Sequence, residues 1–141
     1  MTKNDKIYSM KETCESTGLT YDALKFYCNE GLIPNVKRDK NNYRIFNDND
    51  IAWIKSLSCL KNCGMSIMEM KEYLELCLKG EDSIPERKII LDAKLRELEH
   101  KKQEIQESIN YIHWKHNFYD DVLSGKIKYY SNLISQKMMT K

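Results

Sequence analysis

The sequence predicts a mostly α-helical fold, in which short helices and a basic hairpin precede one long helix of coiled-coil type. Three observations support this fold. Serine followed three residues later by glutamate recurs along the chain and is typical of helix starts. Asn41 and Asn42 interrupt a basic run in the way that a tight hairpin turn requires. From residue 84 onward apolar residues recur at an interval of seven, as in a coiled coil. We expect three parts, at residues 1–80, 83–118 and 119–141.

A pattern of two short helices occupies residues 9–31. Ser9 and Glu12 form a capping box at the start of the first helix, which we expect to end near residue 16. Gly18 then supplies a turn, and Thr20 can cap the helix that follows. Gly31 can adopt the left-handed conformation that ends helices. Two helices joined by a glycine-containing turn are typical of a helix-turn-helix, whose second helix is the recognition helix.

The second helix and residues 37–46 carry the exposed polar groups of this region. Tyr21 and Lys25 lie four residues apart and share one helix face, whereas Leu24 and Tyr27 share another. The stretch 37–46 holds four cations and one acid, namely Lys37, Arg38, Lys40 and Arg44 with Asp39. A helix next to a basic hairpin forms a surface that fits a DNA groove and its flanking phosphates.

Two more helices are expected at residues 48–62 and 67–79. Asn47 or Asp48 can cap the first of them, and Ser66 with Glu69 forms a capping box for the second. Glycines end both helices. Their apolar stripes suggest that they pack on the recognition helix and hold it in place.

The segment 83–118 has the repeat of a long coiled-coil helix. Ser83 and Glu86 read as a third capping box, with Pro85 in the first turn. The stripe at intervals of seven consists of Ile84, Leu91, Leu98, Ile105, Ile112 and Tyr119. The residues before this helix are too few to cover it, so we expect a homodimer. A second line of residues, four positions after each member of the stripe, includes Lys88 and Lys102. These polar members favour an antiparallel pair of helices over a parallel zipper. The tail 119–141 should form one short helix near the far end of the coil.

Composition excludes several other classes. Charged residues make up 31% of the chain and the net charge is only +2, so electrostatic attraction to DNA must come from the hairpin. No apolar run is long enough to cross a bilayer, and the polar residues 2–5 do not resemble a signal peptide. Five cysteines without paired spacings predict a reducing, cytoplasmic environment. Paired carboxylates, a Ser/His/Asp set and a phosphate loop are missing, so we do not expect an enzyme.

These motifs resemble the MerR family of transcription regulators. The resemblance rests on residues 24–27 (LKFY), 30–34 (EGLIP) and 42–46 (NYRIF), and it covers about residues 7–118. It implies a winged helix-turn-helix, an antiparallel coiled-coil homodimer and binding to double-stranded promoter DNA. It further implies that the protein distorts promoters whose elements are spaced too far apart, so that RNA polymerase can engage both elements. Such a protein recognises the shape and deformability of the DNA more than the edges of its bases.

The same resemblance implies particular DNA contacts. Tyr21 and Lys25 would face the major groove, with Lys25 where arginine is usual. Thr20 and Tyr27 would hold phosphates, with the alternative that Tyr27 is an aromatic residue of the core. The wing would be anchored on the DNA backbone by Arg38, Tyr43 and Arg44.

Three residues depart from the usual family pattern. Asp22 stands where a basic residue is common and should repel phosphate, so it would contact a base or a neighbouring lysine instead. Phe26 replaces a frequent tyrosine and lacks its hydroxyl. Asn42 replaces the usual wing glycine, and asparagine tolerates the left-handed conformation needed there.

Residues 51–67 are similar to the subgroup of this family that responds to aldehydes and other electrophiles through one cysteine, matched here by Cys59. A thiolate could attack a soft carbonyl or alkene carbon, and the adduct would change how the helix packs. The alternative is that Cys59 is a small buried hydrophobic residue. Cys59 and Cys63 lie one turn apart but lack further ligands for a metal site, and no cofactor is expected.

The sequence is also compatible with other functions. A second hypothesis is a regulator whose apolar effector binds the aromatic tail, formed by Trp114, Phe118, Tyr129 and Tyr130. A third is a regulator with no small-molecule effector. A pure coiled-coil interaction protein would show no DNA affinity, whereas binding to phosphates weakens steeply with salt.

Overall fold

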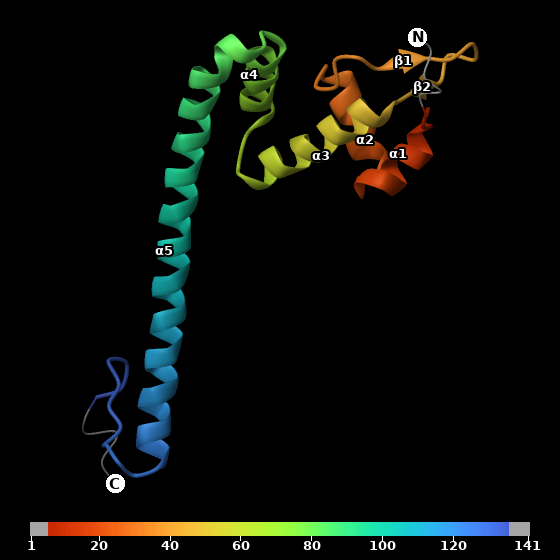
Figure 1. Ribbon diagram of the computed structural model, residues 1–141. Coiled ribbons are helices and arrows are strands. Elements are labelled where there is room, and N and C mark those ends of the chain that lie inside the picture. Colours follow the sequence, from red (N-terminus) through yellow and green to blue (C-terminus); the bar gives the residue numbers. More distant parts are fainter. Residues whose placement is uncertain (1–5, 136–141) are drawn as a thin grey trace. The chain divides into compact units, whose positions relative to one another are not determined.

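The computed structural model describes residues 6–135 and is mostly helical (Figure 1). The elements are α1 (Met10–Thr17), α2 (Tyr21–Asn29), β1 (Lys37–Arg38), β2 (Arg44–Ile45), α3 (Asp48–Asn62), α4 (Ile67–Leu78), a short 3-10 helix (Glu81–Ser83) and α5 (Ile84–Leu123). The chain groups into two compact units, Met1–Arg96 and Glu97–Lys141, with the division inside α5. In the described residues, no helix is both long and apolar enough to cross a membrane.

The starts of the short helices agree with the sequence pattern. At α1 the Glu12 N–H donates to the Ser9 hydroxyl and the Ser9 N–H donates to the Glu12 carboxylate. Reciprocal capping boxes also precede α3, at Asn47, and α4, at Ser66. Thr20 caps α2 by accepting from the Ala23 N–H at 3.1 Å. Because these contacts span only three residues, they fix each helix start locally.

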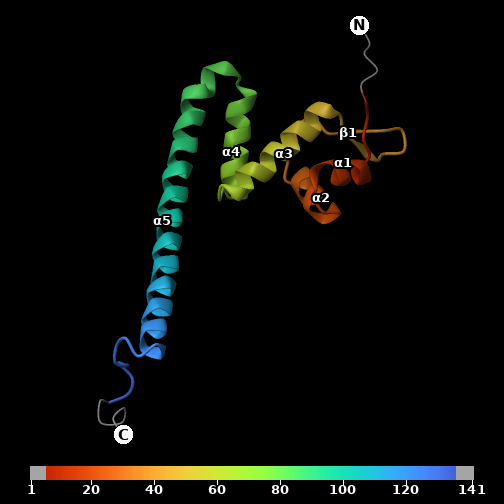
Figure 2. The same cartoon turned by 60° about the horizontal axis from the view of Figure 1, so that its bottom comes forward.

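One hydrophobic core joins the helices of the first unit. α1 contacts both α2 and α3 (Figure 2). The Trp53 indole N–H of α3 donates to the Leu32 carbonyl at 2.7 Å and ties α3 to the loop after α2. The core cluster consists of Leu24, Tyr27, Leu32, Ile33, Phe46, Ile54, Leu57, Leu60, Met65 and Met70. Helices α3 and α4 supply four of these ten residues, and Met65 of the loop between them supplies a fifth, as expected for elements that support α2.

The basic hairpin forms a two-stranded antiparallel wing. Lys37 pairs with Ile45, and Arg38 pairs with Arg44. Asn42 has a φ of 66°, the left-handed conformation that the sequence predicted for it. Tyr8 adds an isolated bridge to Phe46, which joins the segment before α1 to the base of the wing.

The start of α5 differs from the prediction. Ser83 does not form a capping box with Glu86: its side chain is buried and its hydroxyl donates to the carbonyl oxygens of Leu76 and Gly80. Arg87 donates to the Ser83 hydroxyl at 3.0 Å and also to the Gly80 carbonyl. The Leu76 and Gly80 carbonyls also accept from the backbone N–H groups of Lys79 and Ser83. The Ser83 hydroxyl is therefore engaged in the turn after α4 and is not available to cap the start of α5.

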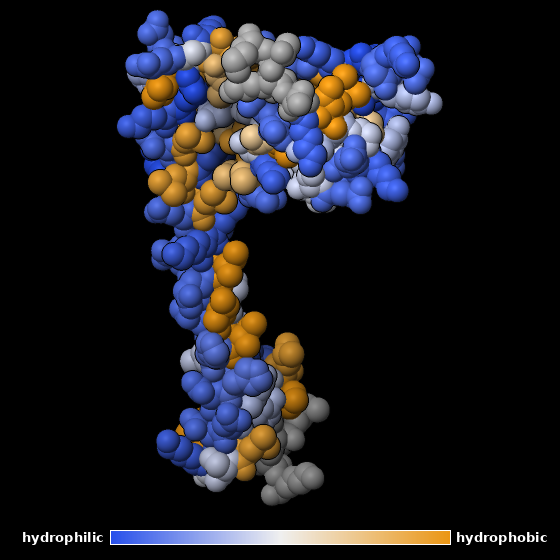
Figure 3. Space-filling model, turned by 45° about the vertical axis from the view of Figure 1, so that its right-hand side comes forward, coloured by the Kyte–Doolittle hydropathy of each residue, from blue (hydrophilic) through white to orange (hydrophobic). Residues whose placement is uncertain are grey.

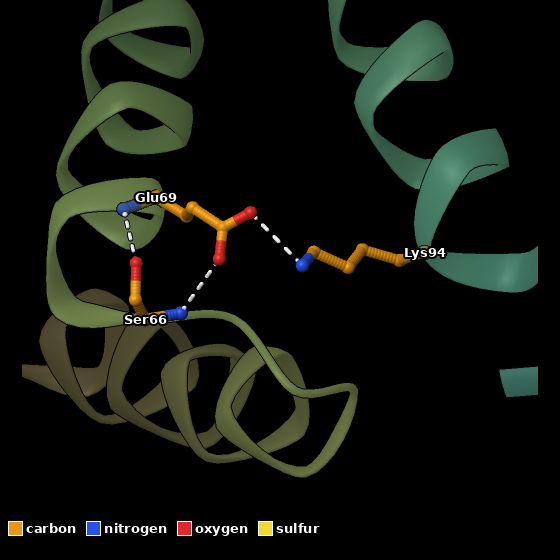
Figure 4. A network of polar contacts seen from close by, with 3 residues as sticks. All are labelled: Ser66, Glu69 and Lys94. Atoms are coloured by element: carbon orange, nitrogen blue, oxygen red, sulfur yellow. Dashed lines mark hydrogen bonds and ion pairs between the residues drawn. The ribbon is translucent and has the colours of Figure 1, made fainter. Parts of the chain in front are cut away.

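A polar network connects the start of α4 to α5 within the first unit. Glu69 accepts from the Ser66 N–H at 3.0 Å and forms an ion pair with Lys94 at 2.9 Å (Figure 4). Lys94 is 8% exposed, which is unusual for lysine. The Ser66 N–H, followed by Lys94, lowers the pKa of Glu69. One carboxylate therefore caps α4 and also holds α5.

In the second unit, the tail folds back on α5 without forming the predicted helix. α5 continues to Leu123, and residues 124–135 form turns and bends. Gly125, with a φ of 80°, follows the end of the helix. Tyr130 then packs on Phe118 with ring centroids 4.8 Å apart. Its position near the far end of the helix agrees with the prediction, but the helical conformation expected within 119–141 was wrong for residues 124–135; residues 136–141 lie outside the described part.

We predict that Glu69→Gln lowers the thermal midpoint at pH 7, because it removes the charge that pairs with Lys94. The pKa of Glu69 lies below its usual 4.5 in the folded protein. Its stabilising contribution is therefore complete above the unfolded pKa and is lost as the pH falls through the folded pKa. The difference between wild type and variant, measured by circular dichroism, should shrink below pH 4.5.

Glu72→Gln is the matched control, since Glu72 is an exposed residue of the same helix. A Glu69→Gln effect as small as that of the control, or one that stays constant down to about pH 3, would contradict the role of the ion pair.

Candidate functional site

The exposed face of α2 carries the residues that the sequence assigned to the major groove. Tyr21 is 56% exposed, and Lys25 is also exposed. Leu24 and Tyr27, on the other face, are 0% and 3% exposed. Asp22 lies exposed in the first turn, where a carboxylate stabilises the helix dipole. α2 therefore presents a tyrosine and a lysine outward and packs the opposite side on the core.

Thr20 and Tyr27 occupy different environments, although both were assigned to phosphates. The Thr20 oxygen accepts from the Ala23 N–H, and this capping bond uses a lone pair and leaves the O–H hydrogen as a donor. Tyr27 is a member of the core cluster, which agrees with the alternative considered for it. Its phosphate contact stays a prediction.

The two wing arginines are held by neutral oxygen atoms. Arg38 donates to the Asn42 carbonyl at 2.8 Å, and Arg44 donates to the Asn29 side-chain oxygen at 2.7 Å. These two arginines are also directly opposite each other in the strand pair. Like charges in that position repel each other. The wing thus concentrates positive charge and orients it, as a phosphate-binding surface requires.

Asp39, the acidic residue of the wing, stabilises the turn between the two strands. One Asp39 carboxylate oxygen accepts from the backbone N–H groups of Asn41 and Tyr43, at 2.9 and 3.0 Å. Such side-chain to backbone bonds are typical of asparagine and aspartate in turns. Tyr43 is 70% exposed next to this turn, so its ring is available to a partner.

The five cysteines are free thiols that differ in accessibility. Cys59 is exposed, whereas Cys14, Cys28, Cys63 and Cys77 are half-buried. Burial raises the pKa of the Cys14 thiol. Burial also raises that of Cys28, although Arg44 and Arg38 act in the opposite direction. The alternative in which Cys59 is a small buried hydrophobic residue is therefore wrong.

The described residues contain no group of three or more His, Cys, Asp and Glu side chains that could hold a metal ion. The second unit contains a cavity of about 530 Å³ between the end of α5 and the tail. Its lining includes Tyr111, Trp114, Phe118, Tyr119, Tyr129 and Tyr130. The cavity is lined by all four aromatic residues that were predicted from the sequence to bind an apolar effector.

Sequence reasoning missed two contacts at the end of α2. Asn29 binds Arg44, as described, and Glu30 forms an ion pair with Lys71 of α4 at 2.9 Å. The partners lie 15 and 41 residues apart in the chain. Spacing along one helix or one turn could not reveal such pairs; a polar residue at the end of α2 was the only signal.

Comparisons with known proteins agree with this geometry. The model of the "MerR HTH family regulatory protein" family matches residues 8–77, and the "MerR, DNA binding" model matches residues 51–113. A Haemophilus influenzae relative, described as an HTH-type transcriptional regulator of uncharacterised role, is 34% identical over 122 residues, which are 86% of this chain and 90% of the relative. The HTH-type transcriptional regulator AdhR of Bacillus subtilis is 36% identical over 92 residues, 64% of this chain and 66% of AdhR.

The fold of this chain is also similar to that of a solved MerR family structure. The crystal structure of HiNmlR, described as a MerR family regulator lacking the sensor domain and bound to promoter DNA, is 32% identical. It matches with a TM-score of 0.72 over 84% of this chain and 90% of that one.

Proposed function

Because the chain belongs to the MerR family, and is therefore a DNA-binding transcription regulator and not an enzyme, we propose that α2 and the wing together form its promoter-binding surface. Tyr21 and Lys25 enter the major groove, while Thr20 and Tyr27, of which Tyr27 is only 3% exposed, hold phosphates. The wing residues Arg38, Tyr43 and Arg44 bind the DNA backbone. The orientation of two wing guanidinium groups by neutral oxygen atoms is the observation that carries this proposal.

The proposed action is distortion of promoter DNA. Contacts to phosphates position a protein on the duplex but do not read its sequence directly. A surface with few base-reading side chains and a basic wing is suited to binding a deformed helix. Untwisting a promoter with widely spaced elements would then allow RNA polymerase to engage both of them.

A homodimer through α5 is part of the proposal. α5 has 40 residues and a length of about 60 Å. Its stripe residues are largely exposed in the single chain, with Ile105 at 61% and Ile112 at 54%. Figure 3 shows apolar side chains at the surface along this helix. Burying such side chains stabilises a pair by about 1.5–3 kcal/mol for each fully covered residue.

We further propose that Cys59 is the effector-sensing residue. Its exposed thiol can reach a soluble reagent, whereas burial shields Cys14 and Cys28 and raises the pKa of both. With an α,β-unsaturated aldehyde, the thiolate adds to the β-carbon and forms a C–S bond. The alkene electrons move to the α-carbon, which takes up a proton from water. No oxidant or reductant is needed.

A second candidate effector site is the aromatic cavity of the second unit. Its volume of about 530 Å³ is within the range of small-molecule sites, and its lining is mainly aromatic. An apolar ligand would bind there without a covalent bond. HiNmlR is described as lacking a sensor domain, which supports the other alternative, a regulator with no small-molecule effector.

Arg44→Ala should weaken promoter binding by about tenfold, since a hydrogen bond to a charged group contributes about 1.5 kcal/mol or more. It should also reduce the slope of log affinity against log salt by about one, because one phosphate contact is lost. Fluorescence anisotropy across a salt series measures both quantities. Lys79→Ala, which removes a charge from an exposed residue after α4, serves as the control. Unchanged affinity in Arg44→Ala would refute the wing assignment.

Leu98→Asp should convert the dimer to monomers in sedimentation, because it places a charge in the apolar stripe. Gln103→Asp is the matched control, since Gln103 is an exposed residue of α5 outside that stripe. It should leave the dimer intact. A Leu98→Asp protein that still sediments as a dimer would rule out pairing through this stripe.

Treatment with a mild aldehyde or quinone should add one adduct to Cys59, as measured by intact mass and peptide mapping. Cys59→Ser should retain DNA binding and lose the electrophile response of a promoter reporter. Cys63→Ser is the control, because Cys63 lies one turn further along and is half-buried. Equal labelling of several cysteines, or a response that survives Cys59→Ser, would exclude Cys59 as the sensor and leave the aromatic cavity to be tested.

A further inference from the structure

Asn29 occupies an unusual position between the recognition helix and the wing. It is the last residue of α2, and its side-chain oxygen accepts from the Arg44 guanidinium at 2.7 Å. A guanidinium group is only a donor, so the interaction fixes which end of the Asn29 amide faces the wing. This bond joins α2 directly to β2.

Because Asn29 is uncharged, its contact can orient the Arg44 guanidinium without neutralising it. A carboxylate at this position would also orient Arg44, but it would neutralise the guanidinium and repel DNA phosphate. An amide oxygen aligns the group and leaves its full charge. The Asn42 carbonyl does the same for Arg38 at 2.8 Å. Both guanidinium groups also lower the pKa of Cys28, the neighbour of Asn29, although burial of that thiol has the larger, opposite effect. The positive charge of both guanidinium groups therefore acts electrostatically at the C-terminal end of α2.

We propose that Asn29 is a positioning residue for DNA binding, which holds the Arg44 guanidinium in the orientation that meets a phosphate. The inference rests on the proposed role of Arg44 in the wing. Asn29 acts through Arg44, so removing Asn29 matters only while Arg44 is present. Since Asn29 and Arg44 come from different elements, the contact also sets the wing at a fixed place beside the C-terminal end of α2.

The test is a double-mutant cycle with the full-length protein and a promoter duplex. Asn29→Ala should weaken binding by about fivefold, because the hydrogen bond that orients Arg44 is lost. In the Arg44→Ala background the same change should alter affinity by less than about twofold, because the guanidinium group that Asn29 orients is then absent. Asn29→Asp should weaken binding more than Asn29→Ala, with a smaller salt slope. Asn62→Ala is the control: Asn62 is the exposed last residue of α3.

The outcomes separate this inference from the proposed function. If Arg44→Ala binds as tightly as wild type, the wing assignment and the positioning role both fail. If Arg44→Ala weakens binding but Asn29→Ala has no effect, or the same effect in both backgrounds, Arg44 keeps its role and the positioning role of Asn29 is refuted. Thermal midpoints, expected to be unchanged in Asn29→Ala, show whether a loss of affinity comes from general destabilisation.

Discussion

The recognition helix α2 has only nine residues, and a helix of this length is not stable alone in water. Its conformation depends on what holds its two ends and its inner face. Thr20 caps the start, and Leu24 and Tyr27 anchor the inner face in the core. The ion pair of Glu30 with Lys71 ties the other end to α4. An ion pair that is this accessible to water contributes little on its own, so the buried face supplies most of the stability.

Helix α4 forms two ion pairs with neighbouring elements. α4 contacts α2 through Lys71 at one position and α5 through Glu69 and Lys94 at another. The contact to α5 is less exposed to water, since the Lys94 side chain is 11% exposed against 39% for Lys71. Water screens the exposed pair more strongly. Solvent and salt should therefore weaken the ion pair between α4 and α5 less than the one between α4 and the end of α2.

Local signals predicted most of the fold, and non-local contacts account for the differences. The starts of α1, α2, α3 and α4 were predicted because each cap spans three residues. Ser83 matched the same pattern, yet its hydroxyl donates to carbonyls at the end of α4, a partner that no motif around Ser83 reveals. The helical pattern of the tail was wrong for residues 124–135 because the contact of Tyr130 with Phe118 replaces helical packing there. At the candidate site the outward face of α2 was predictable, whereas the Asn29 contact was not.

If Cys59 is the sensor, as we propose, its position offers a route from a covalent change to the DNA-binding surface. Cys59 lies between Leu57 and Leu60, which are both buried in the core that also holds Leu24 and Tyr27 of α2. Its carbonyl accepts from the Cys63 N–H at 3.0 Å, next to the turn that leads to α4. An adduct that also crowds the neighbouring buried side chains would strain the core, and close-packed cores transmit such strain. A shift of α3 would move Leu57 and Leu60 against α2, so a change at an exposed thiol can alter the position of a helix that it does not touch.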